Sequence, residues 1–182
     1  MSLRLRSSAG LLFVVVLAAT LLFMSVVPGM AAARKKAAKT PSIVDVAIDV
    51  NTSGPYAGSF DTLIAAVLAA DPAVVQTLTS KGQYTVFAPT DAAFAKLGLN
   101  ETNIGTVPKA DLTKILLYHV AHGRRYAEDV VASDQIRMLN GGFVFQSGGV
   151  LTDAQGGMST IIVTDVEATN GVIHAIDSVL LP

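Results

Sequence analysis

The spacing of the apolar residues changes along this chain, from a helical repeat in its first part to an alternating repeat later. Residues 60–72 place four apolar side chains on one helical stripe. Residues 109–123 repeat this pattern, and we expect a helix there that ends at Gly123. Helices followed by strands indicate an α+β domain with an antiparallel or mixed sheet. The expected strands are two around an Asn-Gly turn within 136–147, and two more at 159–168 and 171–181.

A strand is also expected in the middle of the helical part. The apolar, β-forming run "YTVFAP" at 84–89 predicts a buried strand. Thr90 follows it and can cap a helix over 91–97, with Asp91 in a first turn where the helix dipole favours a negative charge.

The N-terminal region is typical of an export signal. Two arginines precede an apolar run, which is followed by Pro-Gly and a small-residue end at 31–33. We therefore expect a signal peptide at 1–33, a basic linker at 34–41 and one domain at 42–182, and hence a secreted protein, extracellular or periplasmic. An uncleaved leader that anchors the chain in a membrane is the alternative, although the apolar run is slightly short for a bilayer span.

The composition excludes several classes of protein. The chain has no cysteine, so disulfides, thiol chemistry and cysteine-based metal sites are excluded. From Ser42 onward it has 7 Lys and Arg against 14 Asp and Glu. This acidic balance repels phosphates, so we expect no nucleic-acid partner.

Three blocks of sequence carry a family resemblance. The blocks "YTVFAPTDAAFAKL" (84–97), "LLYHV" (116–120) and "NGVIHAIDSVLLP" (170–182) are similar to the first conserved block, the Tyr-His centre and the closing block of the fasciclin domain, in that family's order. The likeness extends from Ile43 to Pro182. It implies a wedge of two small packed β-sheets, flanked by helices mainly from the N-terminal half.

The same resemblance implies a function. Fasciclin domains are exported adhesion or matrix-interaction modules without enzymatic activity. The implied partner is a cell-surface, envelope or matrix protein or polysaccharide, and no cofactor is expected. The family's Tyr-His centre is implicated in receptor binding, so Tyr118 and His119 are the candidate binding residues. The competing interpretation is a structural role, because His119 shares the apolar stripe of its helix and a side chain packed inside cannot make the first contact with a partner. Tyr118, one residue further round the helix, is expected to be partly exposed.

His174 is the other histidine that invites a catalytic interpretation, with Asp177 three residues later. Alternation along a strand points these two side chains to opposite faces, so they cannot form a dyad. We expect a buried imidazole bonded to backbone groups instead. The residues expected to be structural core are His174, Phe87, Thr90, Asp91, Asn170 and Gly171.

Metal and catalytic motifs give little support to other functions. His119 and His122 are three residues apart, which could place both on one helix face, but a metal site needs more ligands and we expect none. Nucleophile-elbow, P-loop, dinucleotide-binding and zincin motifs are absent from the sequence. The leading hypothesis is therefore a non-enzymatic adhesion module. The alternative is an extracellular carrier of small apolar ligands such as lipids, sterols or pigments.

Overall fold

The computed structural model describes residues 41–182, which fall within one compact unit, Lys39–Pro182. The expected signal peptide and all but the last residue of the expected linker lie outside the described residues. The domain boundary at Ser42 stays a prediction. Pro41 is held in place, because its carbonyl accepts hydrogen bonds from both the backbone N–H and the hydroxyl of Thr169.

Side-chain caps define where several helices begin. Ser42 and Asp45 form a reciprocal capping box at the first helix, and Asp71 caps the third helix directly before a proline at its first position. Thr90 accepts a hydrogen bond from Ala93 and caps the fourth helix, as the sequence predicts. The helices are α1 (Ile43–Thr52), α2 (Asp61–Ala69), α3 (Pro72–Thr79), α4 (Asp91–Ala95), the 3₁₀ helix η1 (Ile104–Thr106), α5 (Lys109–Tyr118) and α6 (Ala127–Val131).

The strands form one mixed, continuous hydrogen-bonded order, β2-β1-β7-β6-β5-β4-β3. Among the strand pairs of the described residues, only β1 and β7 are parallel, with Tyr84 opposite Gly171; the other pairs are antiparallel. The α+β class with a mixed sheet is therefore confirmed. The strands are β1 (Tyr84–Pro89), β2 (Val120–His122), β3 (Gln135–Arg137), β4 (Phe143–Ser147), β5 (Val150–Thr152), β6 (Met158–Ala168) and β7 (Gly171–Ile176).

The sheet curls until its two edge strands meet. The long strand β6 joins two groups of strands, because its first part pairs with β5 and the rest pairs with β7. At the far edges, Ala121 of β2 forms an isolated antiparallel bridge with Met138, which follows β3. The N–H of Leu139 also donates to the carbonyl of Val120 at 2.7 Å. The strands thus nearly close into a barrel.

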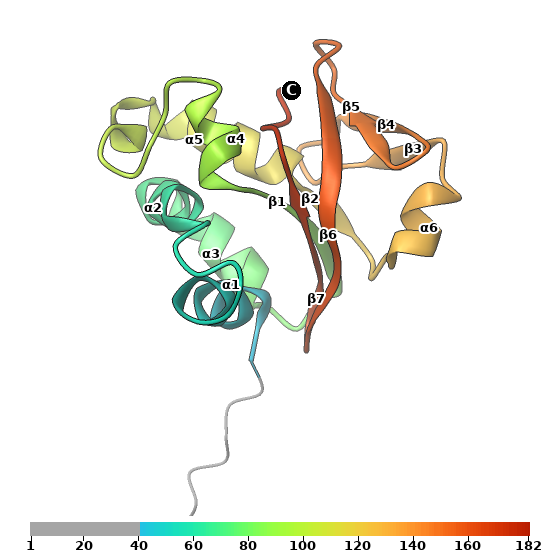
Figure 1. The fold of residues 1–182 in the computed structure, drawn as a ribbon, viewed down its shortest axis with the longest axis horizontal. Coiled ribbons are helices and arrows are strands. Elements are labelled where there is room, and N and C mark those ends of the chain that lie inside the picture. Colours follow the sequence, from blue (N-terminus) through green and yellow to red (C-terminus); the bar gives the residue numbers. More distant parts are fainter. Residues whose placement is uncertain (1–40) are drawn as a thin grey trace, which may run out of the picture. The chain divides into compact units, whose positions relative to one another are not determined.

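The strands β1 and β7 separate two hydrophobic cores. Helices α1 to α3 lie on one side of them and strands β3 to β5 on the other (Figure 1). Ile173 and Ala175 of β7 belong to the core shared with the helices, whereas Ile176 and Phe87 belong to the core inside the curled sheet. Strands covered on both faces read as continuous apolar runs, and every residue of β1 and β7 is buried.

Several sequence-based expectations about elements are wrong. The helix at 109–123 ends at Tyr118, and the chain turns there into the short strand β2. The helix α6 and the strand β5 were not expected, since elements of five and three residues are too short to show a periodic pattern. The final strand stops at Ile176 rather than at residue 181.

Candidate functional site

Tyr118 lies at the point where α5 ends, and its side chain is fully buried, with an exposed fraction of 0%. Its hydroxyl donates to the carbonyl of Phe143 at 2.6 Å and accepts from the N–H of Ala154 at 3.0 Å. Burial raises the pKa of the Tyr118 phenol above its ordinary value. The ring also leaves no room for a side chain at Gly142, where an added Cβ would lie 2.8 Å from it. Tyr118 therefore fixes the start of β4 from inside.

His119 follows directly and is 2% exposed. Its Nδ1 lies 2.8 Å from the carbonyl of Ile115, and its Nε2 accepts the N–H of Leu180 at 3.0 Å. Nδ1 must then carry the proton, so the ring is the neutral tautomer. It links α5 to residues 177–182, which we call the C-terminal segment. Burial lowers the pKa of His119 to about 4, although its hydrogen bond to Ile115 opposes the shift.

These positions correct two expectations. Tyr118 is not partly exposed, and His119 and His122 do not share a helix face, because His122 is an exposed residue of β2. Among the described residues no group of three or more His, Cys, Asp or Glu side chains could hold a metal ion. A binding role for Tyr118 and His119 stays a prediction, and in this conformation neither side chain reaches the surface.

His174 is wholly buried in the middle of β7. Its Nε2 lies 2.9 Å from the carbonyl of Arg125, and its Nδ1 accepts the N–H of Asp165 at 3.3 Å. The ring stacks on Phe87 with centroids 5.7 Å apart. Both ring nitrogens are occupied by backbone groups, so the imidazole holds β7 against its neighbours.

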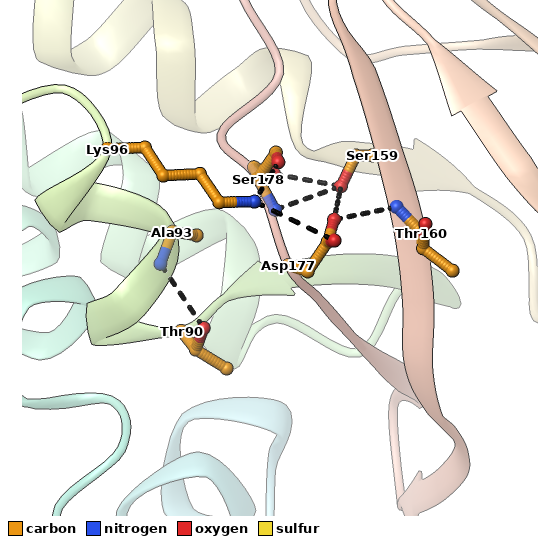
Figure 2. Close-up of polar contacts among 7 residues, drawn as sticks. All are labelled: Thr90, Ala93, Lys96, Ser159, Thr160, Asp177 and Ser178. Carbon is orange, nitrogen blue, oxygen red and sulfur yellow. Dashed lines mark hydrogen bonds and ion pairs between the residues drawn. The ribbon is translucent and has the colours of Figure 1, made fainter.

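Asp177 uses its carboxylate elsewhere, at the start of the C-terminal segment (Figure 2). Its Oδ1 accepts from the N–H of Thr160 at 2.8 Å and from the hydroxyl of Ser159 at 3.3 Å, and Lys96 lies 3.7 Å from Oδ2. Partial burial would raise the pKa of Asp177, but the Thr160 bond and then Lys96 hold it below its ordinary value. The Asp177 carboxylate therefore anchors the start of the C-terminal segment to β6 and is not paired with His174.

The remaining expected core residues connect separate elements. Asp91 is half-buried and lies in the first turn of α4. Its carboxylate accepts hydrogen bonds from the N–H groups of Asp61 and Thr62, so it also caps the start of α2. Asn170 accepts the N–H of Ile43 at 2.8 Å and donates to two carbonyls at the end of α3. Gly171 has no space for a side chain, because a Cβ would collide with the backbone of β1.

The outward-facing side of β3, β4, β5 and β6 carries large apolar side chains, and we call it the outer face. On β4, Val144 and Gln146 point inward and are buried, whereas Phe143 and Phe145 point outward. Phe145 is 53% exposed and Met158 of β6 is 70% exposed. Their neighbours on this face are Gln135, Arg137, Val150, Thr152, Thr160 and Ile162.

Sequence reasoning missed this face, although the signal was present. The alternation within 143–147 places both phenylalanines on one side of the strand. The alternation does not show which side of the strand is covered by the rest of the protein. Because phenylalanine is usually buried, both rings would be assigned to the core.

An apolar cavity of about 160 Å³ lies between α1, α2, α3 and β1. Leu63, Val67 and Leu78 are among its lining residues, and Ile48 and Leu68 are exposed at its boundary. A second cavity of about 160 Å³ lies between α1, the loop after it, β6 and β7, and Ala47 lines both cavities. Together they are the structural basis for considering an apolar ligand.

Comparison with known proteins adds to this description. The model of the fasciclin domain family matches residues 58–182, more than half of the chain. The chain belongs to the fasciclin domain family. The resemblance found in the sequence is therefore confirmed, and the mixed seven-stranded sheet with its helices is a fasciclin fold.

Relatives and solved structures agree with this assignment. The protein sll1483 of Synechocystis is 37% identical over 157 residues, which cover 84% of each chain. The immunogenic protein MPB70 of Mycobacterium bovis is 37% identical over 114 residues, 60% of this chain and 54% of that one. A solved FAS1 domain pair from the insect cell adhesion molecule fasciclin I has a TM-score of 0.55 and 25% identity, covering 68% of this chain and 45% of that chain.

Two further findings concern chemistry and membranes. The described residues show no constellation that indicates catalysis, in keeping with the family. None of the described helices has, by itself, the length and hydropathy of a membrane span. Helices α2 and α3 meet these criteria only as a pair, and that pair is bent by 115°.

Proposed function

We propose that this chain is an exported, non-enzymatic adhesion module that binds a cell-surface, envelope or matrix protein or polysaccharide through its outer face. The observation that carries the proposal is the gathering of Phe143, Phe145 and Met158 on that face. All three are exposed, and Phe145 of β4 and Met158 of β6 flank Thr152 of the intervening strand β5. Contiguous exposed apolar surface marks interaction sites, and aromatic side chains are enriched in them. The likeness to a domain pair of a cell adhesion molecule supports the same role.

In this proposal Tyr118 and His119 act from beneath the surface. The Tyr118 hydroxyl holds the backbone carbonyl of Phe143, the first residue of the proposed binding strand. His119 holds Leu180 and thereby the C-terminal segment. Changes at either residue would alter adhesion through the position of the outer face, without direct contact with the partner.

Adhesion can be measured with beads that carry the purified chain. We expect these beads to resist detachment from surfaces coated with cell-envelope fragments, and the Phe143→Ser, Phe145→Ser double variant to lose at least ~10-fold in binding, because aromatic anchors dominate such interfaces. Treating the coating with protease or with periodate identifies a protein or a polysaccharide partner. Leu97→Ser, which removes an exposed apolar side chain outside the outer face, is the matched control.

A carrier of small apolar ligands is the second candidate, favoured by the two cavities beside α1. A carrier should give a stoichiometric ligand on extraction of the native protein with organic solvent. Ala47→Phe fills the space shared by both cavities, so it should abolish uptake of an apolar fluorophore while leaving bead adhesion unchanged. Absence of ligand from the extract and unchanged uptake by the variant would remove this candidate.

A further inference from the structure

Positive side chains gather where the sheet closes, although the domain is acidic. All three arginines of residues 41–182, Arg124, Arg125 and Arg137, lie at or beside the junction of β2 and β3, together with His122. The domain has only seven Lys and Arg against 14 acidic residues, so this clustering is the opposite of what its average charge predicts. We call the hollow lined by His122, Arg125, Arg137, Met138, Leu139 and Gly141 the seam pocket; its volume is about 390 Å³.

Strand register brings His122 and Arg137 together. The antiparallel bridge joins Ala121 to Met138, so the next pair in the same register is His122 opposite Arg137. Directly opposed residues on antiparallel strands have Cβ atoms about 5 Å apart and point to the same side. Both residues are exposed, and both line the seam pocket.

Arg125 supplies the third polar side chain of the seam pocket. Its backbone is fixed, because its N–H donates to Thr85 and its carbonyl bonds to His174. Its side chain has one long contact, from Nη1 to the Ser133 hydroxyl at 3.4 Å, and its buried Nε has no acceptor among the described residues. A partly buried guanidinium with so few partners is costly unless an acceptor or a counter-charge compensates it.

The carboxylates near the seam do not provide that compensation. No acidic residue lines the seam pocket, and Asp129, which lines the adjoining hollow, accepts a hydrogen bond from the N–H of Tyr126. Within the described residues, Arg125 and Arg137 form no ion pair with a carboxylate. Arg124 is different, because its guanidinium is used by Gln83, Tyr126 and two backbone carbonyls.

We propose that the seam pocket binds an oxyanion, the sulfate or carboxylate group of an acidic polysaccharide, through Arg125, Arg137 and His122. A guanidinium binds such groups through paired N–H donors, and a polar, positively lined hollow suits a charged group better than an apolar ligand. The location also fits, because Arg137 pairs with Phe143, so a bound acid group would lie at the edge of the outer face. The choice of a polysaccharide rests on the proposed adhesive function, whereas oxyanion binding does not.

The site alone is tested with sodium sulfate, by following the arginine Nε–H signals of the full chain by NMR at constant ionic strength. We expect saturable shifts of the Arg125 and Arg137 signals that sodium chloride does not reproduce. Arg137→Gln should weaken sulfate binding about 10-fold, the usual order for one charged hydrogen-bonding partner. Lys109→Gln, which removes a positive charge elsewhere, should leave it unchanged.

The second variant is Arg125→Lys, which keeps the charge and most of the side-chain length but removes the fork of donors, and it should also weaken binding. Unsaturable shifts, or equal binding by Arg137→Gln and Lys109→Gln, would overturn the site. The polysaccharide class is tested separately by adhesion to dextran sulfate and to uncharged dextran. If the chain binds sulfate but does not prefer dextran sulfate, the polysaccharide class is wrong and the oxyanion site stands. If the chain adheres to envelope fragments but does not bind sulfate, the seam-pocket proposal is wrong and the adhesive function stands.

Discussion

Buried polar side chains at the centre of this domain connect elements that are distant in sequence. His119 joins Ile115 to Leu180, and Tyr118 joins Phe143 to Ala154. Each of these side chains offers one donor and one acceptor in the arrangement that its partners need. A buried polar group that loses such a partner costs about 1–3 kcal/mol, so these residues make the fold specific as well as stable.

At this scale the pH dependence of stability should report on His119. Its pKa is lowered to about 4, so the unfolded chain takes up a proton below pH ~6.5 that the folded chain does not. The stabilising contribution is complete above that pH and is lost as the pH falls toward 4, by roughly 3 kcal/mol in all. Urea unfolding at pH 7 and pH 4 should show a larger loss for the native chain than for His119→Gln. Equal losses in the two proteins would contradict the neutral, buried imidazole.

Tyr118→Phe tests the hydroxyl without disturbing the ring. The variant leaves the carbonyl of Phe143 and the N–H of Ala154 without a partner, so the free energy of unfolding should fall by about 1–3 kcal/mol. Adhesion of beads carrying the variant should weaken less than that of the double phenylalanine variant, since the outer face keeps its side chains. If Tyr118→Phe had the same free energy of unfolding as the native chain, the two hydrogen bonds would be dispensable.

At the scale of elements, the C-terminal segment is held by backbone N–H groups. The N–H groups of Ser178, Leu180 and Leu181 donate to Ser159, His119 and Asp153, respectively. Leu180 is fully buried in the core inside the curled sheet. The last residues therefore belong to the fold although they form no strand.

Removing Ile173–Pro182 should abolish cooperative unfolding. The deletion takes away most of β7, the strand that pairs with both β1 and β6. Each large apolar side chain lost contributes about 1.5–3 kcal/mol, and several together exceed a typical net stability of ~5–15 kcal/mol. Removing only Ser178–Pro182 should leave a folded but less stable protein. Thermal melts distinguish these cases, and a transition of the larger deletion near the full-length midpoint would contradict this role of β7.

The sequence was informative for long elements and less so for short ones. Apolar runs predicted β1 and β7, and alternation predicted β4 and β6, because burial imposes a regular pattern over five or more residues. The prediction that the helix would end at Gly123 failed. The chain leaves α5 earlier because β2 pairs with β1, and this contact is distant in sequence. The seam pocket was equally hidden, because its residues come from β2, the loop before α6, β3 and the turn after β3.

At the scale of the whole described domain, possible functions are distributed over three regions, two of which share Arg137. The apolar cavities lie beside α1, the outer face lies on β3 to β6, and the seam pocket lies where β2 and β3 meet. We propose that adhesion uses the outer face. Variants at the apolar cavities should therefore leave the other two surfaces unaffected, whereas Arg137 belongs to both the outer face and the seam pocket.

The most direct measurement is the detachment force of coated beads from envelope fragments, compared for three forms of the chain. We expect strong binding by the native chain and by Leu97→Ser. The Phe143→Ser, Phe145→Ser variant should bind at least ~10-fold more weakly, with an unchanged melting temperature. Equal detachment forces for all three folded proteins would contradict the claim that the outer face carries adhesion.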